Sequence, residues 1–288
     1  MATSTRPLPA HGSRLRREPS LIPNYVVLGA LLIFALGPLV ILTFNSLKDR
    51  AELGRNPLGP PQQFLIGNFA EAWQVGNFAV TTRNSGILVA GTVFGVLFLG
   101  GMAAYSLAKL NLPGAGLLTM YLLIGTSLPI QLYLVPLFFS WQRLSLVNTL
   151  HGLILIYIAT NAPFAVFLLR AYMLQIPSDF EDAARVDGAS EWRVFRSVVL
   201  PVIRPVLATL GIWTFLATWN DFMWPLIVLS DESRYTLPVA LANLAGEHVQ
   251  DTELMMAGSV LTVLPVLAVF LFLQRYYIQG IMAGSVKG

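Results

Sequence analysis

The chain has 288 residues, of which 55% are hydrophobic and only 11% are charged, and its mean hydropathy is +0.66. A soluble domain carries about 25% charged residues, so the composition excludes an ordinary soluble protein and favours a membrane protein. The sequence has no cysteine, which excludes disulfides, thiol catalysis and cysteine-based metal sites.

The N-terminal part predicts a tail followed by a membrane span. Residues 1–22 are rich in Arg, Pro and Ser, and we expect them to form a disordered cytoplasmic tail. Between Glu18 and Lys48 lie 29 uncharged residues, which is enough for an uncleaved transmembrane helix over 23–46. The next segment, 47–78, contains several prolines and is too polar to span, so we expect it outside the membrane.

Residues 79–275 predict five further transmembrane helices. The uncharged runs in this region are 21 to 33 residues long, apart from one that Asp221 interrupts. Each run can hold about 20 apolar residues, the length that crosses a bilayer. The short alternating segments of a β-barrel are absent, so the expected fold class is an all-α membrane protein with six helices. The five helices are expected at 84–108, 117–139, 150–170, 206–229 and 255–275.

The distribution of lysine and arginine predicts how the helices cross the membrane. If the N-terminus is inside, the inside segments hold 12 of the 18 lysines and arginines. The positive-inside rule then places both termini and the loop 177–201 in the cytoplasm, with 276–288 as a cytoplasmic tail. The high pI, near 9.3, therefore needs no nucleic-acid partner, since the excess positive charge lies where inside loops would put it.

The loop 177–201 is unusual because seven charged residues fall within its last 21 positions. Ser178 and Glu181 have the spacing of a capping box, which predicts the start of a helix. Gly188 is expected to end this helix in a left-handed conformation, and Ser190 to cap a second helix. From its residues alone, this helical hairpin fits either docking to a partner or an amphipathic helix on the membrane surface.

The same loop resembles the signature of permease subunits of ATP-binding-cassette (ABC) importers, which is written E-A-A, three residues, G, nine residues, I, one residue, L-P. Asp182-Ala183-Ala184 matches its start with Asp for Glu, and Gly188 matches its glycine. Val198 replaces Ile before Leu200-Pro201, and every gap has the required length. The chain resembles maltose-type carbohydrate permeases from about residue 24 onward. Further matching motifs include Asn84-Ser85, Leu112-Pro113-Gly114, Pro163-Phe164, Thr218-Trp219-Asn220-Asp221-Phe222 and Thr236-Leu237-Pro238-Val239.

This resemblance implies a type I importer permease, one of two non-identical permease subunits that pair with two ATPases and an extracytoplasmic solute-binding protein. It implies import of a carbohydrate, an oligosaccharide or related sugar, across a bacterial or archaeal cytoplasmic membrane by alternating access. The loop would be the coupling helix, whose acidic residue pairs with a basic group of the ATPase. Asp182 is one methylene shorter than Glu, so this pairing could run through Glu181 or a water. The candidate coupling residues are Glu181, Asp182, Ala183, Ala184, Asp187, Gly188, Leu200 and Pro201.

The chain carries no ATP-binding motif of its own. A P-loop needs Gly-Lys-[Ser/Thr], and none of the lysines, which are Lys48, Lys109 and Lys287, follows a glycine. We therefore expect no enzyme activity and no cofactor on this chain, with ATP and Mg²⁺ bound by the partner ATPase. The three histidines lack metal-ligand spacing, so no metal site is expected either.

Polar residues within the predicted spans are candidates for the substrate pathway. Asp221 is the acid inside a span, and an ionisable residue at such a depth is a functional hypothesis by default. It could line a sugar pathway, close an outer gate or, together with Asn220, act as a structural cap. Asn161 in the fourth span is the other candidate. The alternative function is an ion-gradient-driven secondary transporter in which Asp221 is the coupling acid.

Overall fold

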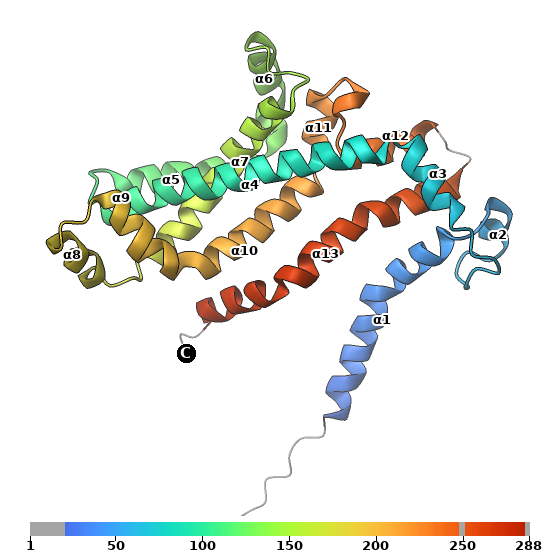
Figure 1. The fold of residues 1–288 in the computed structure, drawn as a ribbon, viewed down its shortest axis with the longest axis horizontal. Helices are drawn as coiled ribbons and strands as arrows, with labels where there is room; N and C mark the ends of the chain where they lie inside the picture. The colour runs from blue at the N-terminus through green and yellow to red at the C-terminus, as the bar shows by residue number, and fades with distance from the viewer. Residues whose placement is uncertain (1–20, 248–250, 286–288) are drawn as a thin grey trace, which may run out of the picture.

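The computed structural model describes residues 21–247 and 251–285, and in these ranges it contains helices and turns but no strand (Figure 1). The predicted all-α class is therefore confirmed. The elements are α1 (Ile22–Asn45), α2 (Arg50–Arg55), α3 (Gly67–Val75), α4 (Phe78–Lys109), α5 (Ala115–Thr126), α6 (Ile130–Arg143), α7 (Leu150–Met173), α8 (Asp179–Val186), α9 (Glu191–Val194), the π-helical turn η1 (Phe195–Val199), α10 (Leu200–Trp219), α11 (Met223–Val228), the 3₁₀ turn η2 (Glu232–Arg234), α12 (Leu237–Glu247) and α13 (Thr252–Ser285).

The centre of the fold is formed by α4, α7 and α10, which pack against one another (Figure 1). Glycines on α4 leave room for α7. A Cβ at Gly91 would come within 2.7 Å of the Ile154 side chain, and one at Gly95 within 2.2 Å of Ile158. Small residues at a helix crossing permit this close backbone approach in membrane proteins. As a result, α4 and α7 form one tightly packed unit.

Among the residues that the structure describes, five helices are long and apolar enough to cross a membrane, and up to six spans result if the bent pair α5–α6 counts as one. The expectation of a single helix over 117–139 is wrong, because α5 and α6 meet at an angle of 97°. Pro129 precedes α6 in an extended conformation. Proline lacks an N–H and disfavours the helical conformation at the residue before it, so the helix cannot continue through Leu128.

The predicted span 206–229 is also interrupted. The first helix, α10, ends at Trp219, and α11 begins only at Met223. The carboxylate of Asp221 lies in this break and accepts hydrogen bonds from the N–H groups of Met223 and Trp224, at 3.3 and 3.4 Å. A side chain that satisfies the free N–H groups at a helix start favours a new helix over continuation of the old one.

The two ends of the chain differ in how they join the bundle. In Figure 1, α1 extends away from the other helices, and none of its most apolar stretch is buried. At the other end, α13 continues as a helix to Ser285, through most of the region predicted as a tail. Residues 1–20, which make up most of the predicted disordered tail 1–22, and residues 286–288 lie outside the described residues.

The bundle has two ends that matter for function. The loop end carries residues 174–199, with α8 and α9, beside the last turn of α4 (Figure 1). At the opposite end, the first turns of α4 lie beside residues 230–237, a segment that leads into α12 (Figure 1). No helix was expected between the predicted spans 206–229 and 255–275, where the structure has α12.

Candidate functional site

The loop at the loop end is a helical hairpin, as its sequence predicts. The first helix, α8, is followed by Gly188, whose φ of +79° is the left-handed conformation expected there. The capping box is not formed, because the side chain of Ser178 makes no capping hydrogen bond. The Glu181 carboxylate is directed elsewhere, into the bundle.

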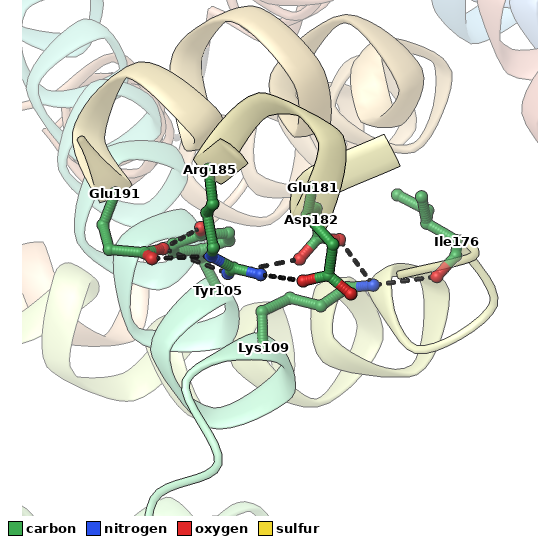
Figure 2. A network of polar contacts seen from close by, with 7 residues as sticks. All are labelled: Tyr105, Lys109, Ile176, Glu181, Asp182, Arg185 and Glu191. Carbon is green, nitrogen blue, oxygen red and sulfur yellow. Dashed lines mark hydrogen bonds and ion pairs between the residues drawn. The ribbon is translucent and has the colours of Figure 1, made fainter. Parts of the chain in front are cut away.

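Glu181 forms an ion pair with Lys109, the last residue of α4 (Figure 2). The Lys109 Nζ atom lies 2.6 Å from Glu181 Oε1, and the two side chains are only 7% and 1% exposed. The same ammonium donates to the backbone carbonyl of Ile176 at 2.8 Å. A buried charge is tolerated only when it is paired, so these contacts fix α8 against the end of α4.

Arg185 connects α8 to the start of α9 (Figure 2). Its guanidinium donates to Glu191 at 2.8 and 3.2 Å and to Asp182 at 2.8 Å. The hydrogen bonds to Glu191, and then the one to Asp182, raise the pKa of Arg185 above its ordinary value. Glu191 also accepts a hydrogen bond of 2.6 Å from the hydroxyl of Tyr105 on α4. The hairpin is thus tied to α4 through two separate carboxylates, Glu181 and Glu191.

The exposed surface of the hairpin is both apolar and acidic. Phe180 and Val186 on α8 are large apolar side chains that are 63% and 87% exposed. Glu181 is buried, so the exposed acidic side chains of α8 are those of Asp179 and Asp182; Asp182 is 63% exposed and pairs with Arg185. Of the other candidate coupling residues, the exposed ones are Ala183, Asp187, Gly188 and Pro201, and the partly buried ones are Ala184 and Leu200.

Two of the residues that anchor the hairpin, Tyr105 and Lys109, are not among those predicted from the sequence. The prediction concentrated on the loop itself and missed Tyr105 and Lys109, which come from α4. The sequence does contain an indication of Lys109's role, because Lys109 is the single charged residue between Arg83 and Arg143. An isolated charge at the end of an apolar helix needs a partner, and the carboxylates of the loop were the available ones.

The loop end also contains a π-helical turn. The N–H of Leu200 donates to the carbonyl of Phe195, five residues earlier, rather than four. Pro201 follows directly and has no N–H to continue a regular ladder. The second helix expected after Ser190 is therefore short: α9 ends at Val194 and leads through η1 into α10, without a side-chain cap from Ser190.

The predicted pathway residues lie in two places. Asn161 on α7 lines a hollow of about 640 Å³ together with four aromatic side chains and several smaller residues. Asn220 and Asp221 instead lie in the break between α10 and α11. The aromatic side chains that line the hollow are Tyr121, Tyr133, Phe164 and Trp213.

Asp221 has the contacts of a structural residue. Besides the two N–H groups at the start of α11, its carboxylate accepts a hydrogen bond of 2.5 Å from the hydroxyl of Tyr157 on α7. The amide of Asn220 donates to the carbonyl of Leu216, within its own helix, at 2.9 Å. These bonds secure the α10–α11 break against α7.

A bundle of apolar helices with a charged hairpin locked to its end defines a multi-pass membrane protein. A family model described as "Binding-protein-dependent transport system inner membrane component" matches residues 96–282. The chain is 34% identical over 280 residues to the diacetylchitobiose uptake system permease protein NgcG of Streptomyces coelicolor, covering 96% of this chain and 92% of that one. The chain therefore belongs to this family of inner-membrane transport components, whose members are transporters rather than enzymes.

Other relatives and a solved structure agree with this assignment. The chain is 36% identical to the arabinooligosaccharides transport system permease protein AraQ of Halalkalibacterium halodurans, covering 88% of this chain and 92% of that one. It is 34% identical to the trehalose transport system permease protein SugB of Mycobacterium tuberculosis, covering 93% and 95%. A chain of a bacterial ABC transporter that imports alginate has the same fold, with a TM-score of 0.78 at 24% identity over 94% of this chain and 100% of that one.

Proposed function

We propose that this chain is one permease subunit of an ATP-driven, binding-protein-dependent importer of a carbohydrate. The observation that carries the proposal is the hairpin of α8 and α9, which is locked inward by Glu181 and presents Phe180 and Val186 outward. A rigid surface with large exposed apolar side chains is what a docking site for a soluble partner requires. The relatives supply the substrate class, since their names specify diacetylchitobiose, arabino-oligosaccharides and trehalose.

The partners follow from this assignment. We expect a homologous second permease subunit, two ATPases that bind ATP and Mg²⁺, and a solute-binding protein on the other side of the membrane. The chain has no P-loop lysine, which supports hydrolysis by the partner subunits. The positive-inside distribution supports a cytoplasmic loop end and an extracytoplasmic opposite end.

Within the docking surface, each residue has a distinct task. Phe180 and Val186 supply the apolar contact, and the small Ala183 lets the partner approach closely. Asp182 is the group offered to a basic residue of the ATPase, since Glu181 is engaged by Lys109. Closure of the ATPase dimer around ATP would move this hairpin, and with it the helices that line the pathway.

The hollow beside Asn161 is the proposed sugar-contacting region of this subunit. Aromatic rings and an amide are suited to a carbohydrate, because rings cover its apolar faces and amides hydrogen-bond its hydroxyls. Trp213 is 57% exposed there, whereas Trp219 and Trp224 are buried in the core. The contacts of Asp221 are those of a cap, so the geometry does not favour an ion-coupled transporter.

The test is co-purification of the affinity-tagged chain from native membranes. Val186→Asp places a charge in the apolar contact of α8, and we expect it to remove the ATPase subunit that accompanies the wild type. Leu58→Asp is the matched control, because Leu58 is 71% exposed in the segment after α2, at the other end of the bundle. A wild-type chain that purifies without an ATPase, or an ATPase retained equally by both variants, would overturn the docking assignment.

A further inference from the structure

We infer that α4 carries movement between the ATPase-docking hairpin and the segment 230–237 at the opposite end, with Lys109 and Asn84 as the positioning residues at its two ends. The inference rests on the proposed function, because it names the element through which the docked ATPase acts on the far side of the membrane. It assigns a role to residues that contact neither ATP nor sugar.

At the loop end, α4 holds the hairpin at separate points along the chain (Figure 2). Lys109 reaches the carbonyl of Ile176, before α8, and the carboxylate of Glu181, within it. Tyr105, one turn earlier on α4, reaches Glu191 at the start of α9. A movement of the hairpin therefore cannot leave α4 behind unless a buried ion pair breaks.

At the opposite end, α4 holds the segment 230–237 in a similar way. The side-chain amide of Asn84 donates to the carbonyls of Ser233 and Tyr235, at 2.9 and 3.1 Å. The hydroxyl of Ser85 accepts from the N–H of Leu237 at 2.9 Å. Asn84 and Ser85 are almost fully buried, since only 1% and 2% of their surfaces are exposed. The backbone at the start of α12 is thus fastened to α4.

Between these two ends, α4 is one uninterrupted helix. It is a single helix of 32 residues without an internal proline, whereas α1, α6, α7, α10 and α13 each contain one. From Asn84 to Lys109 it spans roughly 37 Å at 1.5 Å per residue. Glycines would soften an isolated helix, but Gly91 and Gly95 are pressed against α7, so the pair bends less than α4 would alone.

The alternative route through α10 is weaker, although α10 follows the hairpin directly in the chain. Its junction with the hairpin is the π-helical turn, which is followed by Pro201 and Pro205. Kinks and π-bulges are where helices bend under load. Its other end stops at Trp219, before the break. A movement of the hairpin would bend α10 at these points, whereas α4 would carry the movement to the opposite end.

The test uses the assembled importer and MgATP as the probe, so the sugar need not be known. The chain has no cysteine, so Glu232→Cys places one thiol on the exposed turn next to Ser233. Its labelling rate by a membrane-impermeant maleimide is measured with and without MgATP and vanadate. With α4 intact, we expect nucleotide to change the rate by about fivefold or more, within the usual range of coupling between distant sites.

Three variants in this background decide the matter. Asn84→Ala removes two of the three hydrogen bonds at the opposite end. Lys109→Met with Glu181→Gln removes the buried ion pair at the loop end without leaving a buried charge. Either should reduce the nucleotide-dependent change, and the ATPase should still co-purify because the exposed Phe180 and Val186 of α8 are unchanged. Ser106→Ala is the control, because the Ser106 hydroxyl bonds only to the carbonyl of Met102 within α4. It should keep the wild-type response.

The remaining outcomes are also decisive. A nucleotide response that keeps its wild-type size in Asn84→Ala and in the loop-end double variant overturns the inference while leaving the proposed function intact. The same holds if the assembled, ATP-hydrolysing importer that carries Glu232→Cys alone shows no change in the labelling rate of its thiol. A wild-type chain without an ATPase partner would instead refute the proposed function. If Asn84→Ala assembles poorly, Ser85→Ala, which removes one bond to the same segment, is measured in its place.

Discussion

Lys109 and Glu181 form a buried ion pair that joins the last residue of α4 to the first turn of α8. Removing either partner leaves the other charge buried without compensation, which costs roughly 3–5 kcal/mol. We therefore expect Lys109→Met and Glu181→Gln each to lower the thermal unfolding temperature of the detergent-purified chain. The double variant should recover most of the loss, since no unpaired charge remains. Two losses that simply add in the double variant would show that the residues do not act as a pair.

The turn between α8 and α9 depends on Gly188, whose φ is +79°. Space is not the constraint, because a Cβ there would meet nothing within 4 Å. The constraint is the left-handed backbone conformation, which costs residues other than glycine about 1–2 kcal/mol. We expect Gly188→Ala to lower the midpoint of thermal unfolding. Gly116→Ala is the control, since Gly116 lies in α5 with open space around it and without a positive φ, and alanine there should be neutral or stabilising. Equal effects of the two substitutions would contradict the role of backbone strain.

Arg185 holds two helices through a planar guanidinium that bonds both oxygens of Glu191 and one of Asp182. A lysine keeps the positive charge but cannot form this fork. We expect Arg185→Lys to loosen α9 relative to α8, seen as faster amide hydrogen exchange in residues 187–194, with α7 unchanged. Exchange that remains at the wild-type rate would mean that charge alone is sufficient.

Much of this architecture follows from local sequence signals. The long uncharged runs predict the spans, and the fixed gaps from Asp182 to Pro201 predict the hairpin with its glycine turn, because both depend on residues close together in the chain. The same signals fail at residues 127–129 and 220–222. There the apolar composition continues, but a proline or a capping carboxylate ends the helix. Hydropathy averages over a window and does not register such single residues.

The interior of the site depends on contacts between distant segments, which is why the sequence did not reveal it. The spacing of Ser178 and Glu181 correctly indicates a helix start, but it assigns Glu181 to its own backbone. In the fold, Lys109 on α4 provides a stronger partner and draws the carboxylate inward. The choice between two partners for one carboxylate is settled by burial and charge, which become known only when α4 and α8 are placed side by side.

Asp221 provides a prediction that separates an ATP-driven importer from an ion-coupled transporter. Its carboxylate accepts from the hydroxyl of Tyr157 and from the N–H groups at the start of α11. Asparagine is as good an N-cap as aspartate, so Asp221→Asn should leave uptake and stability close to wild type, whereas Asp221→Ala should lose about 1 kcal/mol of stability. Uptake is measured in cells with and without a protonophore, and unfolding is followed on the purified chain. An ion-coupling acid cannot be replaced by a neutral amide, so abolished uptake in a fully stable Asp221→Asn variant would contradict the role of Asp221 as a cap and favour the ion-coupled alternative.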